Sequence, residues 1–443
     1  MTAGSDGRVI RGAVLTYRDD PAVAEPDRAV RFYRNGAVAI SGDGRIVWRG
    51  HAGRLPERFR ALPSDDHGEA LVLPGFIDAH VHFPQYRMLA APGKDLLDWL
   101  NRFTFPEEQR YASPSHARAA AEVFLDRLVQ HGTTAAVVFS TVHRSAAEVL
   151  FAAAERRGQA IVSGKTLMDR NAPAALCDDP ESGARDSEAL IARWHRRGRL
   201  RYAITVRFAI TSTEAQLREA GALAARHPDC HVHSHLSESA GEIEFMRRLF
   251  PQAKDYTDVY DRFGLLGPRS LYAHGIHLSE RECARLSESG TVVVHCPTSN
   301  TFLGSGLFDA AHVGRSDRPV RIGIATDVGG GTSYSMLHTL GEAYKVAILG
   351  GRTPGAHALF HLATRGNAMN LGLDDEIGSL EPGRWADIVV LDPTATPVLE
   401  ARHALSESLE DTLFALAILG DDRAVRATYI AGRRVWGAAP GPE

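Results

Sequence analysis

Two histidines stand one residue apart at the end of an apolar segment, in the order Asp78-Ala79-His80-Val81-His82. Side chains two positions apart on a β-strand point to the same side, so both imidazoles are expected on one face. Imidazoles paired in this way are typical ligands of a transition metal, and zinc is the first candidate. Taken alone, the pair fits two buried, hydrogen-bonded histidines equally well.

Further groups of the same kind stand at the ends of other apolar segments. The run His231-Val232-His233-Ser234-His235-Leu236-Ser237-Glu238 contains three histidines of one face. We predict His235 as a metal ligand because it is the outermost of the three. His233 would lie about 6.7 Å deeper along the strand and is predicted to be structural. His274 and Asp327 each close another apolar segment.

These residues together predict a catalytic metal site. All five fall at the C-terminal ends of expected strands, on four strands in total: His80, His82, His235, His274 and Asp327. A zinc ion with an open coordination position lowers the pKa of bound water from 15.7 to about 7 and supplies a hydroxide near neutral pH. Glu238 stands three residues beyond His235. A carboxyl group there can move protons between the water and a substrate.

Several competing motifs are missing from the sequence. It contains no HExxH and no GxSxG, and it lacks the PCxxC half of the cytidine-deaminase zinc signature. Residues 158–166 resemble a phosphate-binding loop, but five residues separate Gly158 from Gly164 where that motif requires four. Cys296, as a soft ligand, and Lys165, as a modified bridge to a second metal, are weaker candidates.

A (β/α)₈ barrel would bring these strand ends together. Short apolar segments alternate with longer helical ones, such as residues 114–131 and 214–227. Eight segments are expected to be strands: 71–81, 134–139, 160–168, 202–210, 231–235, 270–274, 291–295 and 320–326. Eight such alternations predict an α/β fold with a TIM-like barrel, whose active site lies at the C-terminal strand ends. The alternative, an open doubly wound sheet, needs fewer strands and a point where the strand order reverses.

The two ends of the chain are expected to form a small β domain. Residues 37–40 and 45–48 read as strands around the turn Ser41-Gly42-Asp43-Gly44, and residues 386–391 and 427–435 have the same character. The predicted division is therefore residues 1–70 and 378–443 in a composite β-sandwich domain, and residues 71–377 in the barrel.

Composition favours a cytoplasmic protein that binds neither nucleic acid nor membrane. The 443 residues include 50 basic and 54 acidic ones, so a basic excess is lacking. No apolar run reaches the roughly 18 residues of a membrane span, and Met1–Arg11 lacks the apolar core of a secretory signal. The four cysteines form no CxxC pair, which argues against a disulfide framework.

Longer motifs resemble the amidohydrolase superfamily, specifically its single-metal nucleobase deaminases. The resemblance runs from the HxH of His80 and His82 to residues 378–387, Gly-Ser-Leu-Glu-Pro-Gly-Arg-Trp-Ala-Asp. Within this branch, four segments are similar to the guanine deaminase family: Pro84-Gln85, residues 96–107 (LLDWLNRFTFPE), residues 207–211 (RFAIT) and residues 326–337 (TDVGGGTSYSML). The chain departs from that family's pattern at Gly330, where alanine is frequent.

The resemblance implies hydrolysis of guanine to xanthine and ammonia by a zinc-bound hydroxide, as part of purine catabolism. It implies one Zn²⁺ per chain, with Fe²⁺ as the alternative, bound by His80, His82, His235 and Asp327. It also implies a set of purine contacts: Gln85, Trp99, Arg207, Phe208, His235, Glu238 and Asp327. A homodimer is implied by the resemblance alone.

Three catalytic roles follow from the same resemblance. Asp327 would take a proton from the attacking water, and His274 would orient the oxygen. Glu238 would begin protonated and donate to the ring nitrogen next to C2, so burial should raise its pKa.

Some alternatives stay open. The substrate could be another ring, namely 8-oxoguanine, cytosine, an adenosine derivative or a triazine. Outside the enzymes, a catalytically inactive scaffold is the alternative. Trp99 either closes over the purine or belongs to the core of an amphipathic helix. Arg207 either pairs with a loop carboxylate or donates to the purine carbonyl at C6, which suits its permanently charged donors.

Overall fold

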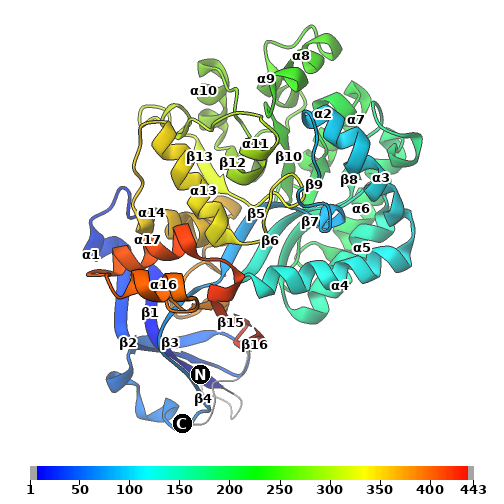
Figure 1. Cartoon of the computed structure of the whole chain (residues 1–443). Coiled ribbons are helices and arrows are strands. Elements are labelled where there is room, and N and C mark those ends of the chain that lie inside the picture. Colours follow the sequence, from blue (N-terminus) through cyan, green and yellow to red (C-terminus); the bar gives the residue numbers. More distant parts are fainter. Residues whose placement is uncertain (1–6, 438–443) are drawn as a thin grey trace.

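Eight parallel strands form the barrel that carries the strand-end residues (Figure 1). The computed structural model describes residues 7–437. The strands neighbour one another in the order β5 (Phe76–His82), β6 (Thr133–Phe139), β7 (Ala160–Gly164), β9 (Arg201–Val206), β10 (His231–Leu236), β11 (Ser270–His274), β12 (Val292–His295) and β13 (Arg321–Ile324). The short β8 (Thr166–Leu167) follows β7 and pairs with β9.

The first and last strands meet, which nearly closes the barrel. The Asp327 amide donates to the His80 carbonyl at 3.0 Å, and the His82 amide donates to the Val328 carbonyl at 2.8 Å. The side-chain amide of Asn367 donates to one carbonyl of each strand, at 2.7 and 2.8 Å. The predicted barrel is therefore confirmed, and the open doubly wound sheet is not observed in residues 7–437.

Helices surround the barrel and cover the outer face of its strands (Figure 1). They include α4 (Pro114–Gln130), α5 (Arg144–Arg157), α6 (Pro180–Trp194), α7 (Glu214–Arg226), α8 (Ala240–Leu249), α10 (Glu280–Ser289) and α13 (Met336–Leu349). Ser113 caps the start of α4 and Thr213 that of α7, each with a side chain that accepts a backbone amide. The helices predicted over 114–131 and 214–227 are thus confirmed. Among the described residues, no helix is both long and apolar enough to cross a membrane.

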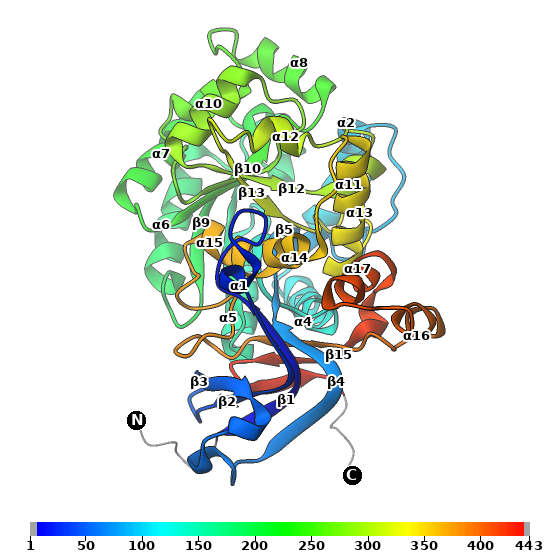
Figure 2. The same ribbon diagram turned by 90° about the vertical axis from the view of Figure 1, so that its left-hand side faces the viewer.

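Both ends of the chain contribute to one seven-stranded mixed sheet beside the barrel (Figure 2). Its strands lie in the order β16 (Arg433–Trp436), β15 (Val425–Ile430), β14 (Ile388–Leu391), β4 (Ser64–Pro74), β1 (Arg8–Tyr17), β2 (Val30–Ile40) and β3 (Ile46–His51). The antiparallel pairing of β4 with β14 joins the two ends of the chain. The predicted β domain built from both ends is confirmed, and it takes the form of this mixed sheet.

The expected strand 71–81 is wrong as a single element, because the structure divides it in two. Residues 71–74 end β4 and pair with β14, whereas β5 begins at Phe76. Gly75 lies between them, and a Cβ at that position would collide with Thr134. The run from residue 71 to residue 77 contains no polar residue, but Pro74-Gly75 at its centre is a pair typical of turns and is the local signal for this break. The proposed domain boundaries at 70/71 and 377/378 stay a prediction.

Two other strand ends differ in ways that matter for the site. The strand expected over 202–210 ends at Val206, so Arg207 and Phe208 lie in the connection that follows it. The segment 160–168 is split into β7 and β8 around Lys165. Segment 427–435 is the hairpin of β15 and β16.

A core at the junction of the barrel and the small sheet contains helices that the sequence did not predict. These are α14 (Ala356–His361), α16 (Pro397–His403) and α17 (Leu409–Leu419). Buried side chains from β1, α13 and α17 meet there, including Tyr17, Leu337 and Leu413. The mixed sheet and the barrel are thereby packed against a shared set of helices.

Candidate metal and active site

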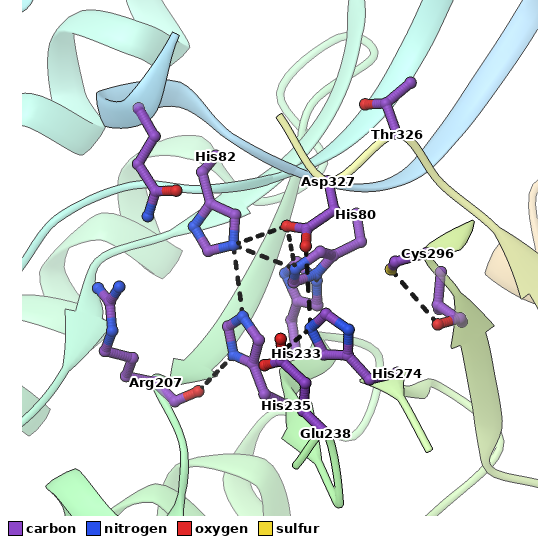
Figure 3. A network of polar contacts seen from close by, with 12 residues as sticks. His80, His82, Arg207, His233, His235, Glu238, His274, Cys296, Thr326 and Asp327 are labelled. Atoms are coloured by element: carbon purple, nitrogen blue, oxygen red, sulfur yellow. Dashed lines mark hydrogen bonds and ion pairs between the residues drawn. The ribbon is translucent and has the colours of Figure 1, made fainter. Parts of the chain in front are cut away.

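Four potential ligand atoms meet at the C-terminal mouth of the barrel (Figure 3). Nε2 of His82 lies 3.1 Å from Nε2 of His80 and 3.3 Å from Nε2 of His235. Oδ1 of Asp327 lies 3.3 Å from Nε2 of both His80 and His82. Ligands about 2.0–2.1 Å from a zinc ion in tetrahedral geometry stand about 3.3–3.4 Å apart. Four of the six distances among these atoms therefore match such a site, and His82 connects His235 to the other two ligands.

Hydrogen bonds from behind orient two of these imidazoles. Nδ1 of His235 lies 2.6 Å from the carbonyl oxygen of Arg207 and must donate to it, which leaves Nε2 unprotonated and able to bind a metal. Nδ1 of His80 lies 2.7 Å from Nε2 of His233. His233, predicted to be structural, thus supports a ligand from one layer below.

Burial and neighbouring charges favour the protonation states that a metal requires. Burial lowers the pKa of His82 to about 4 and that of His235 well below its usual value, so both imidazoles are neutral at physiological pH. Burial alone would raise the pKa of Asp327, but hydrogen bonds to His80 and His82 hold it well below the usual range. The cluster therefore combines neutral nitrogens with an ionised carboxylate.

His274 stands between the two carboxyl groups of the site. Its Nδ1 lies 2.8 Å from Oδ1 of Asn300, and its Nε2 lies 3.3 Å from Glu238 and 3.9 Å from Asp327. The backbone φ is +77° at His274 and +49° at Asp327. Non-glycine residues in such conformations cost roughly 1–3 kcal/mol each and cluster at functional sites.

Glu238 is buried beside the cluster without being one of its four ligand atoms. Burial, and secondly the charge of Asp327, raise the pKa of Glu238 well above its usual value. Its Oε1 accepts from the Ser305 hydroxyl at 3.5 Å. A neutral carboxyl group in this position can act as a general acid. The direction of the pKa shift agrees with the prediction from the sequence.

A cavity lies over the cluster of proposed ligands. The residues predicted from the sequence supply most of its wall: His82, Gln85, Trp99, Arg207, Phe208, His235, Glu238, His274 and Asp327. Leu96, Leu100 and Leu303 were missed and add apolar surface. Leu96, Trp99 and Leu100 have the spacing of one helical face. This spacing is the signal that could have found Leu96 and Leu100.

The long first loop contributes one wall of the cavity. It contains α2 (Leu96–Trp99), a π-helical turn (Leu100–Thr104) and α3 (Phe105–Gln109). Trp99 is buried in the hydrophobic core and also lines the cavity. The two alternatives for Trp99 therefore do not exclude each other.

Glu108 is a buried charged residue next to the cavity that the sequence analysis missed. Its two carboxylate oxygens accept from Nη1 of Arg207 at 2.9 and 2.7 Å. Nε2 of Gln85 donates to the same carboxylate at 3.0 Å. Arg207 thus pairs with a loop carboxylate, as one alternative predicted, and lines the cavity as well.

The two weaker candidates have other partners. Lys165 donates to Asp178, so its amine is paired rather than free to bridge a second metal. Burial raises the pKa of the Cys296 thiol well above its usual value, and the thiol donates to the Val294 carbonyl at 3.5 Å.

Comparison with known proteins decides the family. The model of the "Amidohydrolase family" matches residues 71–435. The chain belongs to the amidohydrolase family. This amidohydrolase is 44% identical to the guanine deaminase of Escherichia coli (strain K12), over 97% of this chain and 98% of that protein. The guanine deaminase family recognised from the sequence motifs is thereby confirmed.

Solved structures agree with this assignment. The guanine deaminase from Bradyrhizobium japonicum has a TM-score of 0.94 at 36% identity and covers 98% of this chain and 99% of that chain. The guanine deaminase from C. acetobutylicum, with bound guanine in the active site, has a TM-score of 0.87 at 26% identity, over 97% of this chain and 100% of that chain. The similarity therefore includes both the barrel and the mixed sheet of this amidohydrolase.

Proposed function

We infer that this amidohydrolase hydrolyses guanine to xanthine and ammonia. One observation carries the inference: three of the four proposed ligands, a buried acid and an arginine line one cavity in a chain that is 44% identical to a guanine deaminase. The inactive scaffold is disfavoured because every expected ligand group is present and directed to one point. Deamination of another ring has no separate observation in its favour.

We propose that one Zn²⁺ per chain is held by His80, His82, His235 and Asp327. Three neutral nitrogens and one carboxylate oxygen suit Zn²⁺, and they suit Fe²⁺ as the alternative. Such an ion lowers the pKa of a water ligand and makes it a nucleophile near neutral pH.

The side chains of the protein would move the protons. Asp327, which its histidine neighbours keep ionised, accepts a proton from the attacking water. Glu238, which burial keeps neutral, donates its proton to the ring nitrogen beside C2. Its carboxylate then takes the proton of the new hydroxyl group at C2 and passes it to the departing amine, and the proton held by Asp327 restores the neutral acid. His274 lies within 3.3 Å of Glu238 and 3.9 Å of Asp327, where it orients the attacking oxygen.

A panel of nucleobases tests the proposed function. Ammonia release should be measured on protein of known metal content, with guanine, 8-oxoguanine, cytosine, adenosine and a triazine as substrates. We expect guanine to have the highest kcat/KM. A higher value for any other ring would overturn the proposed substrate.

Arg207→Ala should weaken the preference for guanine over 2-aminopurine. A guanidinium donates without accepting, so it suits the carbonyl of guanine at C6, which 2-aminopurine lacks. A site that forms hydrogen bonds with a polar substrate group can reject an analogue that lacks this group by about 10⁴–10⁵-fold in kcat/KM. In the wild type we therefore expect a large preference for guanine over 2-aminopurine. In Arg207→Ala the ratio of the two kcat/KM values should shrink, mainly because guanine hydrolysis falls.

The metal content of Arg207→Ala, compared with that of the wild type, is the control in this experiment. His235 is oriented by the backbone carbonyl of Arg207, which alanine retains, so the metal content should not change. An unchanged ratio of guanine to 2-aminopurine would show that Arg207 does not read the carbonyl, and Gln85 would be the next candidate. The predicted homodimer and cytoplasmic location stay predictions.

A further inference from the structure

We propose that Glu108 is a positioning residue that sets the hydrogen-bonding direction of Gln85 and Arg207, and so determines which purine edge the cavity accepts. The inference rests on the proposed function. It concerns a residue that lies behind the cavity wall and has no direct contact with the substrate in this scheme.

The three side chains come from separate parts of the chain and meet away from solvent. Gln85 ends the 3₁₀ turn after β5, Glu108 belongs to α3, and Arg207 follows β9. Their exposed fractions are 1%, 1% and 2%. Gln85 and Arg207 line the cavity, whereas Glu108 is not among the lining residues. A charge buried so completely needs its partner, so Glu108 and Arg207 depend on each other.

Glu108 fixes the orientation of the Gln85 amide. A carboxylate only accepts hydrogen bonds, so the Gln85 group that faces it must be the NH₂ group. The amide oxygen then points the other way. Within residues 7–437, this Oε1 is buried and has no hydrogen-bond partner. Buried acceptors without a partner are rare, and Oε1 is therefore available to a donor on the substrate.

Glu108 also engages only one of the three guanidinium nitrogens of Arg207. Nη1 is engaged by both carboxylate oxygens. The other two guanidinium nitrogens donate to no protein group in the described part of the chain, and Arg207 is one of the residues that line the cavity. An Arg207 held by Glu108 thus offers donors next to the acceptor that Gln85 offers.

This donor–acceptor pair matches one edge of guanine. The lactam edge has a carbonyl at C6, which accepts, and an N–H at N1, which donates. 2-Aminopurine has neither group, because its N1 is an acceptor and its C6 carries only hydrogen. The arrangement set by Glu108 therefore selects a lactam, independently of the chemistry at C2.

Glu108→Gln tests this role. Glutamine can donate as well as accept, so the Gln85 amide is no longer held in one orientation, and Arg207 loses its charged partner. We expect kcat/KM for guanine to fall by roughly 10²-fold and that for 2-aminopurine to fall less, so that their ratio shrinks by at least about tenfold. If turnover of 2-aminopurine is too slow to measure, its inhibition constant against guanine replaces kcat/KM. The metal content should remain that of the wild type.

Glu107→Gln is the matched control. Glu107 precedes Glu108 on α3 but pairs with Arg110 at 2.9 Å and Arg87 at 3.3 Å, away from the cavity. The same substitution there should leave the guanine to 2-aminopurine ratio unchanged.

Specific outcomes would overturn the proposal. An unchanged ratio in Glu108→Gln, or an equal fall for both substrates, would assign Glu108 a purely structural role. If this variant does not fold, the double variant Gln85→Glu with Glu108→Gln tests the proposal instead. The amide at position 108 then donates to the carboxylate at position 85, whose other oxygen is still directed to the cavity. We expect the pair to prefer guanine, and loss of the preference would overturn the proposal. Metal-loaded wild type without guanine hydrolysis would instead contradict the proposed function.

Discussion

Glu238→Gln is expected to fold and to keep its metal, while kcat for guanine hydrolysis falls by roughly 10²–10⁴-fold. Glutamine has nearly the same size as glutamate, and Glu238 contributes none of the four ligand atoms. An amide cannot release a proton to the ring nitrogen or relay it to the amine. The measurements are steady-state ammonia release and the metal content of the same preparation.

The pH dependence of kcat gives this prediction a second observable. Burial, and then the charge of Asp327, raise the pKa of Glu238, and the neutral acid is the active form. In the wild type, kcat should therefore be full below this raised pKa and should fall as the pH rises through it. The residual activity of Glu238→Gln should lack this basic limb.

Glu244→Gln, on α8, is the matched control for Glu238→Gln. Glu244 is exposed and pairs with Arg248 at 2.6 Å, so its replacement should leave kcat and the pH profile unchanged. Near-normal turnover in Glu238→Gln would show that another group carries the proton.

The buried cluster of histidines and Asp327 was predictable from the sequence because the residue chemistry and the strand pattern coincide. The HxH pair shares one face of a strand by its spacing alone, and His235 and Asp327 each end an apolar segment. A parallel barrel brings all strand ends to one side, so their meeting follows once eight strands are recognised. The structure adds what spacing cannot give, namely the four contacts of 3.1–3.3 Å that make a single site.

Glu108 shows why part of the site could not be predicted. Glu107 and Glu108 are adjacent, chemically identical and part of the same loop, yet Glu107 is half-buried and pairs with arginines at the surface, whereas Glu108 is fully buried. The partner of Glu108 is Arg207, 99 residues further along the chain, so no local pattern joins them. The available signal was weak: Glu108 stands three residues after the buried Phe105 and so shares its helical face.

The break at Gly75 has a similar origin. An apolar segment long enough to belong to two sheets looks like one buried strand, since both parts are covered on both faces. Two features separate them: the turn pair Pro74-Gly75, and the pairing of residues 71–74 with β14, which lies more than 300 residues away. The apolar pattern alone therefore hides an element boundary that the Pro-Gly pair marks locally.

His82→Ala is expected to lose both the metal and the activity. Nε2 of His82 lies within 3.3 Å of the corresponding atoms of His80 and His235 and of Asp327 Oδ1, so it contacts every other member of the cluster. Alanine removes one of four donors and leaves a site that cannot complete tetrahedral coordination. Without the metal, the pKa of the attacking water returns toward 15.7, and hydrolysis should fall by at least about 10³-fold. Purified wild type should contain about one transition metal per chain by mass spectrometry.

His231→Ala separates loss of a ligand from loss of a buried histidine. His231 lies on the same face of β10 as His235, but its Nε2 lies 2.9 Å from the Leu371 carbonyl at the other end of the barrel. We expect this variant to keep its metal and its guanine hydrolysis, even if its unfolding midpoint is lower.

Removal of the metal from the wild type with a chelator should abolish activity, and added Zn²⁺ should restore it, whereas His82→Ala should not recover. The structure pairs Lys165 with Asp178, so we expect no second metal at this lysine. Two metals per chain, with Lys165 required for the second, would contradict the single-metal site.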